Sequence, residues 1–191
     1  MANTKFKYFI LTGDPGVGKT TLTKKIASCL RETGISTSGF YTEEVRRNRV
    51  REGFDVVTLD GDRGRLAREE SLLNSPVKHR VGKYGVTIQE FENLALPSLE
   101  KVNTCSPHLL VIDEIGKMEF YSQLFKTKIK DIFSDTSNSV VLASIPMRKS
   151  DAVIEAIRNH KNAKVFVVTR ENRNTIDKAI MEEMKRTLNV I

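Results

Sequence analysis

The sequence contains little cysteine and histidine and no tryptophan. Its two cysteines, Cys29 and Cys105, lie far apart in different segments, so nothing suggests a disulfide framework or a C-x-x-C metal site. The three histidines are scattered along the chain without the spacing of metal ligands. We therefore expect no metal site built from protein side chains alone. Because Cys29 falls on an apolar helical stripe, we expect it to be a buried core thiol.

Long hydrophobic runs are also missing. No segment approaches the length that spans a membrane, and the apolar run Tyr8–Leu11 is too short for the core of a signal peptide. That run leads directly into a glycine-rich loop, so cleavage there would remove the strand that carries the loop. We expect an intracellular, cytoplasmic protein without a membrane partner, and nothing in the sequence excludes the nucleus.

Neither the length nor the composition suggests disorder. With 191 residues, of which 39% are hydrophobic and 29% charged, the chain can bury one sizeable core, so we expect a single domain over residues 1–191 and a monomer. The 31 basic and 24 acidic residues give a net charge of +7, which attracts polyanions. Aromatic and basic residues are not interleaved as in nucleic-acid-binding modules, so we expect no nucleic-acid partner.

Apolar runs alternate with amphipathic segments, a pattern typical of an α/β fold with a mostly parallel sheet and helices on both faces. The basic stretch Arg46–Arg51 and the turn dipeptides Asp60-Gly61 and Arg63-Gly64 indicate a β-hairpin insertion. The expected strands are Tyr8–Leu11, Ile35–Val45, Phe54–Leu59, Leu109–Ile112, Val140–Ala143 and Val165–Val168. One expected helix follows the glycine-rich loop and ends before Gly34, and others begin at Thr87 (by a capping box), Ser122, Asp151 and Asn174.

The glycine-rich loop matches the G-x-x-x-x-G-K-[ST] pattern of a P-loop, the Walker A motif. Its glycines allow backbone N–H groups to converge on phosphate oxygens, and the helix that follows adds the positive end of its dipole. Lys19 can reach the β- and γ-phosphates, and the Thr20 hydroxyl can bind Mg²⁺. The expected phosphate-binding residues are Gly13, Asp14, Pro15, Gly16, Val17, Gly18, Lys19 and Thr20.

A second nucleotide contact is expected where the apolar run Leu109–Ile112 ends in two acids, as in a Walker B motif. Ligands lie at the carboxyl ends of parallel strands, so Asp113 should bind the same Mg²⁺ through water. Glu114 should orient or deprotonate the attacking water, which makes Glu114 and Lys19 the expected catalytic pair. The predicted contact segment consists of Val111, Ile112, Asp113, Glu114, Ile115 and Gly116.

Residues 113–116 also fit the D-x-x-G spacing by which GTPases sense the γ-phosphate. A GTPase should then carry [NT]-K-x-D after a later strand, where this chain has Thr169-Arg170-Glu171-Asn172. Guanine offers two neighbouring donors that one carboxylate can accept together, whereas Asn172 has a single acceptor oxygen. The sequence therefore does not support strict selection of guanine.

Other polar residues are secondary candidates. Ser144 ends the strand after the acidic site, where it could sense the γ-phosphate or cap the strand. Lys117 and Glu119 follow the acidic strand and could reach the phosphates or be solvated. Charge neutralisation in the transition state could come from Arg148, Arg170 or Arg173.

Six segments in order carry a resemblance to a known family: Gly13–Thr21, Gly39–Val45, Gly53–Leu59, Leu94–Pro97, Val111–Glu119 and Thr169–Arg173. Together they resemble the small P-loop nucleoside-triphosphatase family, whose members include the cancer-related nucleoside-triphosphatase of animals. The resemblance covers nearly the whole chain. It implies a RecA-like fold and slow, Mg²⁺-dependent hydrolysis of several nucleoside triphosphates to the diphosphate and phosphate. Asp14 and Arg170 depart from residues common in similar proteins, and the resemblance identifies no physiological substrate.

The sequence thus predicts a Mg²⁺-dependent hydrolase of ATP, GTP, CTP and UTP with broad base tolerance. Two alternatives remain. A small-molecule or nucleotide kinase could use the basic hairpin Arg46–Arg51 as a lid over two phosphates. A nucleotide-dependent RNA-binding switch could use the +7 surface.

Overall fold

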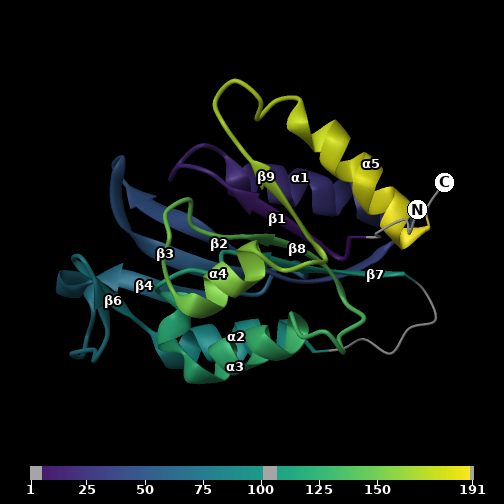
Figure 1. Ribbon diagram of the computed structural model, residues 1–191. Helices are drawn as coiled ribbons and strands as arrows, with labels where there is room; N and C mark the ends of the chain where they lie inside the picture. Colours follow the sequence, from purple (N-terminus) through teal and green to yellow (C-terminus); the bar gives the residue numbers. More distant parts are fainter. Residues whose placement is uncertain (1–5, 101–106, 190–191) are drawn as a thin grey trace.

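The computed structural model describes residues 6–100 and 107–189 of the chain. Within these ranges, nine strands form one sheet in the order β5-β6-β4-β3-β2-β7-β8-β1-β9 (Figure 1). The strands are β1 (Tyr8–Thr12), β2 (Ser36–Arg47), β3 (Val50–Thr58), β4 (Arg63–Glu69), β5 (Arg80–Val81), β6 (Tyr84–Val86), β7 (His108–Asp113), β8 (Val140–Ser144) and β9 (Ala163–Val167). The α-helices are α1 (Lys19–Glu32), α2 (Ile88–Ser98), α3 (Gln123–Ile132), α4 (Ala152–Arg158) and α5 (Ile176–Leu188). Two short 3₁₀ helices are Glu70–Leu72 and Glu119–Tyr121.

The sheet is parallel at one end and antiparallel at the other. Strands β2, β7, β8, β1 and β9 pair in parallel, whereas β3, β4, β6 and β5 continue the sheet antiparallel from β2. Strand β2 belongs to both parts: residues 36–41 pair with β7, and residues 40–47 pair with β3. The predicted α/β fold with a hairpin insertion is confirmed, and the insertion is larger than one hairpin.

Helices cover both faces of the sheet (Figure 1). Helices α1 and α5 lie on one face and α2, α3 and α4 on the other. Successive residues of β1 alternate between two cores: Phe9 and Leu11 pack with residues of α1 and α5, and Tyr8 and Ile10 pack with residues of α2 and α3. All five residues of β1 are buried, which fixes the strand that leads into the P-loop.

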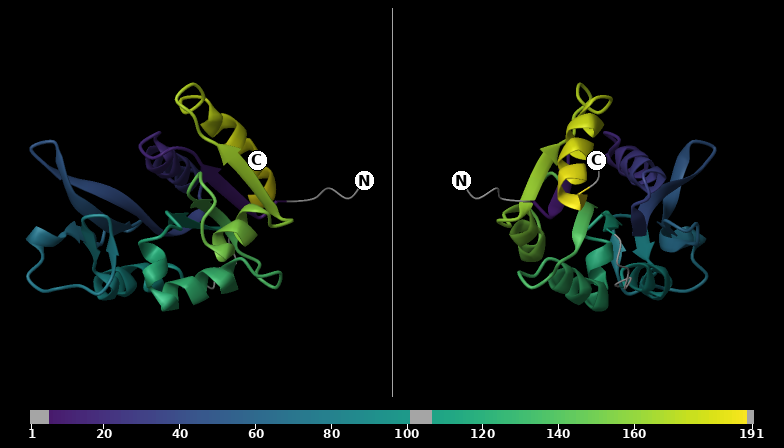
Figure 2. Two further views of the ribbon diagram at one scale, coloured as in Figure 1. Left: turned by 60° about the vertical axis from the view of Figure 1, so that its left-hand side comes forward. Right: turned by 90° about the vertical axis from the view of Figure 1, so that its right-hand side faces the viewer.

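The β2–β3 hairpin extends beyond the body of the protein (Figure 2). Its strands run through the basic stretch and turn at Asn48 and Arg49, both with positive φ, as in a tight two-residue hairpin. The register pairs Tyr41 of β2 with Asp113 of β7. The residues of β2 after Tyr41 therefore lie beyond the carboxyl end of β7, on the edge of the sheet that carries the P-loop.

Some local predictions are wrong. Gly64 lies inside β4 instead of in a turn. A Cβ at this position would come within 2.7 Å of the Leu94 side chain on α2, so the glycine permits close packing of that helix on the strand. Helix α2 begins as expected after Thr87, but without a capping box. The Thr87 hydroxyl donates to the backbone oxygen of Arg65, and Glu90 accepts from the backbone and side chain of Arg65. Contacts with β4 replace the local cap.

Three further details differ from what the sequence pattern suggests. Helix α5 begins after Thr175 instead of after Asn174. Leu124 of α3 is apolar but 61% exposed. Cys29, expected in the core, is only partly buried, and Cys105 lies outside the described residues.

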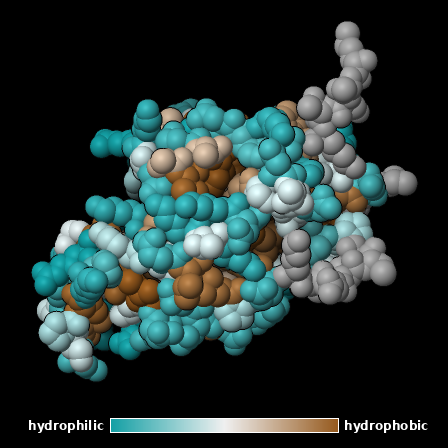
Figure 3. Space-filling model, turned by 60° about the horizontal axis from the view of Figure 1, so that its bottom comes forward, coloured by the Kyte–Doolittle hydropathy of each residue, from teal (hydrophilic) through white to brown (hydrophobic). Residues whose placement is uncertain are grey.

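Within the described part of the chain, no helix is both long and apolar enough to cross a membrane. The face that carries α2 and α3 shows hydrophobic side chains in separate patches between hydrophilic ones (Figure 3).

Candidate functional site

The P-loop joins β1 to α1 at the carboxyl edge of the sheet. Gly18 caps the helix with a left-handed φ of 112° and no side-chain cap, and the first turn of α1 contains no acidic residue. The N–H groups of that turn are therefore open to an anion, and the helix dipole favours negative charge there. Gly13 lies directly against the end of β9, since a Cβ on it would come within 2.4 Å of the Val168 oxygen.

Lys19 lies across this loop. Its side chain is nearly buried, with the residue 9% exposed, and its Nζ donates to the backbone oxygens of Gly13 at 2.9 Å and Asp14 at 3.3 Å. The ammonium group is thereby held over the loop where the glycines meet. Asp14 itself is exposed, and Lys19 contacts its backbone oxygen.

Asp113 ends β7 and is 1% exposed. Its Oδ1 accepts a hydrogen bond from the Ser144 hydroxyl of the neighbouring strand β8. Its Oδ2 is buried without a hydrogen-bond partner. Burial raises the pKa of Asp113, while the nearby hydroxyls of Ser144 and Thr20 and the charge of Lys19 oppose that rise. The structure thus brings four predicted residues together: Lys19, Thr20, Asp113 and Ser144.

These oxygens fit a divalent cation. A buried carboxylate oxygen without a donor, next to a threonine hydroxyl on a P-loop, is the donor set that holds Mg²⁺ beside a triphosphate. Among the residues that the structure describes, no group of three or more His, Cys, Asp or Glu side chains could enclose a metal ion. A cation at Thr20 and Asp113 would therefore need further oxygens from phosphates and water.

Glu114 and Glu119 form an acidic pair on either side of Gly116. A Cβ on Gly116 would lie 3.0 Å from Glu114 Oε1 and 2.9 Å from Glu119 Oε2. Burial raises the pKa of Glu114. The positive charge of Lys19 opposes this rise, and the negative charge of Asp113 adds to it. Glu119 is only 5% exposed, and burial together with the charge of Glu114 raises its pKa to about 8, although the nearby backbone of Glu119 and Gly116 opposes the rise. A pKa of about 8 favours the protonated form of Glu119 at pH 7.

The remaining candidates are separated by the structure. Lys117 is exposed, as are Arg148 and Arg170. Arg173 is also exposed, but its guanidinium donates to the Val17 oxygen at 3.5 Å and its side chain passes Gly18. Of the three arginines that sequence reasoning could not rank, Arg173 contacts the P-loop.

A cavity of about 360 Å³ adjoins the P-loop on the side of β9. It is lined by residues of the P-loop, Met147 after β8, and residues 167–171. Sequence reasoning missed Met147, and it predicted a strand over Val165–Val168 without placing it in the sheet. The apolar run gave no signal that β9 is the edge of the sheet.

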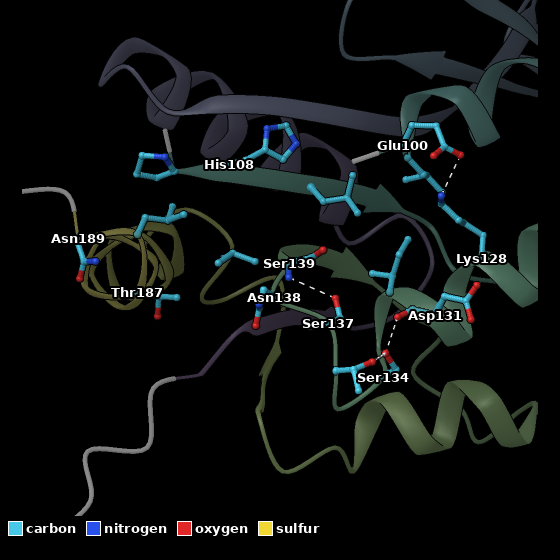
Figure 4. Close-up of a pocket in the computed structure, with 17 residues that line it drawn as sticks. Glu100, His108, Lys128, Asp131, Ser134, Ser137, Asn138, Ser139, Thr187 and Asn189 are labelled. Atoms are coloured by element: carbon cyan, nitrogen blue, oxygen red, sulfur yellow. Dashed lines mark hydrogen bonds and ion pairs between the residues drawn. The ribbon is translucent and has the colours of Figure 1, made fainter. Parts of the chain in front are cut away.

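A larger cavity, of about 740 Å³, lies at the opposite edge, near the amino ends of β7 and β8 (Figure 4). Its charged and polar groups pair locally: Lys128 binds Glu100, and Ser134 donates to the backbone oxygen of Asp131. The ring nitrogens of His108 bond to Ser36 and Ser38. The length of β7 separates this cavity from Asp113, so it takes no part in the site at the P-loop.

The chain matches known proteins over most of its length. Residues 8–181 match the family model described as NTPase. The chain is 49% identical over 175 residues to the human cancer-related nucleoside-triphosphatase, covering 88% of this chain and 91% of that protein. It is 41% identical over 176 residues to the nucleoside-triphosphatase THEP1 of Thermotoga maritima, covering 92% and 94%.

Two solved structures share the fold. The solution structure of a human cancer-related nucleoside triphosphatase superposes with a TM-score of 0.80 at 45% identity, over 95% of this chain and 98% of that one. The crystal structure of THEP1 from Aquifex aeolicus superposes with a TM-score of 0.78 at 38% identity, over 91% and 96%.

Proposed function

The chain belongs to the NTPase family, and from that premise we propose that this nucleoside-triphosphatase uses Mg²⁺ to hydrolyse ATP, GTP, CTP and UTP slowly to the diphosphate and phosphate. One observation carries the proposal: the unpartnered Oδ2 of Asp113, buried beside Thr20 at the mouth of an uncapped P-loop helix. The residues of the site join one continuous sheet, which supports a single domain over residues 1–191; we propose that it acts as a monomer.

The P-loop binds the triphosphate. Backbone N–H groups between Gly13 and Thr20 donate to phosphate oxygens, because the loop glycines and the bare first turn of α1 leave these groups open. The Lys19 ammonium exchanges its bonds to the Gly13 and Asp14 oxygens for bonds to the β- and γ-phosphates. That exchange costs little, since charged oxygens replace neutral ones as acceptors.

Thr20 and Asp113 are the residues that would hold a magnesium ion, Thr20 by its hydroxyl and Asp113 through water. Such an ion would supply positive charge for the β- and γ-phosphates. Ser144 keeps Asp113 in place by its hydrogen bond to Oδ1, which leaves Oδ2 without a protein partner. Ser144 is thus a positioning residue.

Glu114 is the general base. It follows the metal-binding aspartate directly, and burial raises its pKa toward the range in which a carboxylate accepts a proton efficiently near neutral pH. Glu119, protonated near pH 7, adds no second negative charge beside it. Water held by Glu114 can then attack the γ-phosphate while its proton moves to the carboxylate.

The slow turnover that we propose is explained by the lack of a firmly placed arginine at the γ-phosphate. A firmly placed arginine at the γ-phosphate contributes roughly 10³–10⁵-fold in related hydrolases. Arg173 is the candidate here, but it is exposed and bound to the loop by one long contact of 3.5 Å. We therefore expect only part of that acceleration.

The alternatives gain no support from the hairpin. Its Arg46 and Arg51 both bind Glu44 of the same hairpin, and Arg47 pairs with Glu52. Three of the four arginines of the stretch are thus held within the hairpin, and the two glutamates offset half of the positive charge that a lid over phosphates or an RNA surface would need.

A phosphate-release screen tests the proposal. Wild-type protein should release phosphate from all four nucleotides with Mg²⁺, and excess chelator should stop the reaction. Acceleration by one compound from a pool of metabolites would instead indicate a kinase. Activity that rises with RNA and falls with salt would indicate an RNA-dependent switch.

A further inference from the structure

The segment that follows β8 lies between the two halves of the site. Strand β8 has β1, which leads into the P-loop, on one side and β7, which ends in Asp113, on the other. Ser144 at the end of β8 binds Asp113, and its backbone oxygen accepts from the Ile115 N–H at 2.9 Å. The Ile145 N–H donates to the Leu11 oxygen of β1 at 2.9 Å. The position of this segment therefore sets how the acidic end of β7 lies relative to the P-loop.

Arg158, the last residue of α4, reaches this segment. Its side chain is only 20% exposed. Its Nη2 donates to the Pro146 oxygen at 2.5 Å, and its Nη1 donates to the Thr12 hydroxyl at 3.5 Å. Thr12 comes directly before the P-loop, and its hydroxyl donates to Met147 Sδ at 3.9 Å. One guanidinium group thus ties the end of β1 to the segment that follows Ser144.

The charge of Arg158 is compensated within α4. Its Nε donates to Glu155 Oε2 at 3.2 Å, and Oε1 of Glu155 accepts from the Ser150 N–H at 3.2 Å. The same ion pair therefore holds both ends of the loop over residues 146–150. A largely buried ion pair contributes little net stability, because desolvation offsets the attraction, so a fixed geometry is the better reason for it. Lysine could not replace the arginine, since a single nitrogen cannot serve three acceptors in different directions.

We propose that Arg158 is a positioning residue for the metal-binding carboxylate: it fixes the segment after β8, and thereby Ser144, so that Asp113 is held beside the P-loop. The inference deepens the proposed function and rests on it. Pro146 lies two residues after Ser144, so Arg158 acts through the backbone and needs no contact with the nucleotide. Loosening this tie should weaken the use of Mg²⁺ and leave the binding of phosphates by the P-loop intact.

The experiment uses the variant Arg158→Lys, which keeps the charge beside Glu155. The Mg²⁺ concentration for half-maximal phosphate release should rise by about tenfold, with nucleotide affinity in the absence of Mg²⁺ unchanged. In the Ser144→Ala background the same substitution should cause no further rise, because both changes act on Asp113 along one path. Hydrogen exchange of the nucleotide-free protein gives a readout besides activity: the Ile145 amide should exchange faster in Arg158→Lys.

Arg65→Lys is the matched control. Arg65 of β4 also binds a carboxylate, that of Glu90, but in the antiparallel part of the sheet. Its replacement should change neither the metal requirement nor the exchange at Ile145. Thr12→Val guards against an unfolded Arg158 variant, because it removes one acceptor of the guanidinium group and keeps the shape of the side chain. It should raise the Mg²⁺ requirement in the same direction.

An unchanged Mg²⁺ requirement in both Arg158→Lys and Thr12→Val would overturn the inference and leave the hydrolase standing. Additive effects of Arg158→Lys and Ser144→Ala would also overturn it, since Arg158 would then act independently of Asp113. The same holds if Arg65→Lys raises the metal requirement as much, because the effect would then reflect general loss of stability. Full wild-type hydrolysis in excess chelator would remove the proposed role of Mg²⁺ and the inference with it.

Discussion

Ser144 on β8 donates a hydrogen bond to Oδ1 of Asp113 on β7, and Oδ2 of the same carboxylate is buried with no partner. One oxygen thus positions the side chain and the other is available to a ligand. The two strands pair in parallel, so both residues end at the same edge of the sheet.

Replacing Ser144 by alanine should weaken metal use without removing the P-loop. The concentration of Mg²⁺ that gives half-maximal phosphate release should rise, because Asp113 loses the bond that orients it. The free energy of unfolding should fall by about 1–3 kcal/mol, since a buried acceptor loses its donor. A metal titration and denaturant unfolding measure the two effects. An unaltered Mg²⁺ requirement would remove the positioning role.

Lys19→Ala should abolish turnover and weaken triphosphate binding sharply, because it removes the P-loop side chain aimed at the γ-phosphate. Lys24→Ala is the control: Lys24 lies one turn later on α1 and pairs with Glu43. Phosphate release and calorimetric titration with a non-hydrolysable triphosphate measure the change. Wild-type turnover in the Lys19 variant would mean that the active site lies elsewhere.

Glu114→Gln should lower kcat by about 10²–10⁴-fold and leave nucleotide affinity nearly unchanged, because the amide keeps the shape but cannot accept a proton. The variant should accumulate the triphosphate-bound form in mass spectrometry. Glu69→Gln, which affects only a pair with Lys83, provides the control. A joint fall of affinity and kcat would place Glu114 with Asp113 at the metal instead.

Glu119→Gln should change how stability depends on pH. Burial raises the pKa of Glu119 from 4.5 to about 8, so the folded protein keeps this proton between those values while the unfolded chain releases it. Wild-type stability therefore loses this contribution progressively from about pH 4.5 to 8. Because glutamine does not titrate, the melting temperature of the variant should gain on that of the wild type from pH 5 to pH 9. Parallel curves would show that Glu119 is ionised in the folded state.

Asn172→Asp supplies the carboxylate found in guanine-selective proteins, yet it should not produce GTP preference. Aspartate cannot donate to the Val167 oxygen as Asn172 Nδ2 does, so the expected result is a loss of about 1 kcal/mol in stability. Competition between GTP and ATP and a thermal melt measure both outcomes. A strong gain in GTP selectivity would show that the side chain is free to reach the base.

The residues at the P-loop and at the end of β7 were predictable because their chemistry is local. A short buried strand, a glycine loop and a helix follow one another within Tyr8–Glu32, and backbone preferences over a few residues decide that arrangement. The apolar runs likewise predicted the parallel sheet. The position of Asp113 and Glu114 beside the P-loop was predictable because they come directly after a strand, and parallel strands end at one edge of the sheet.

The sequence by itself determined the P-loop between a strand and a helix, the place of Asp113 at the end of a strand and the α/β class, because each depends on neighbours in the chain. Only the tertiary structure decided that Glu119 is buried against Glu114, that Arg173 contacts the P-loop, and that β9 is an edge strand with Val167 exposed. Strand order and burial depend on residues far apart in the sequence. An apolar run has the same sequence pattern in a central strand and in an edge strand, so the pattern cannot distinguish them.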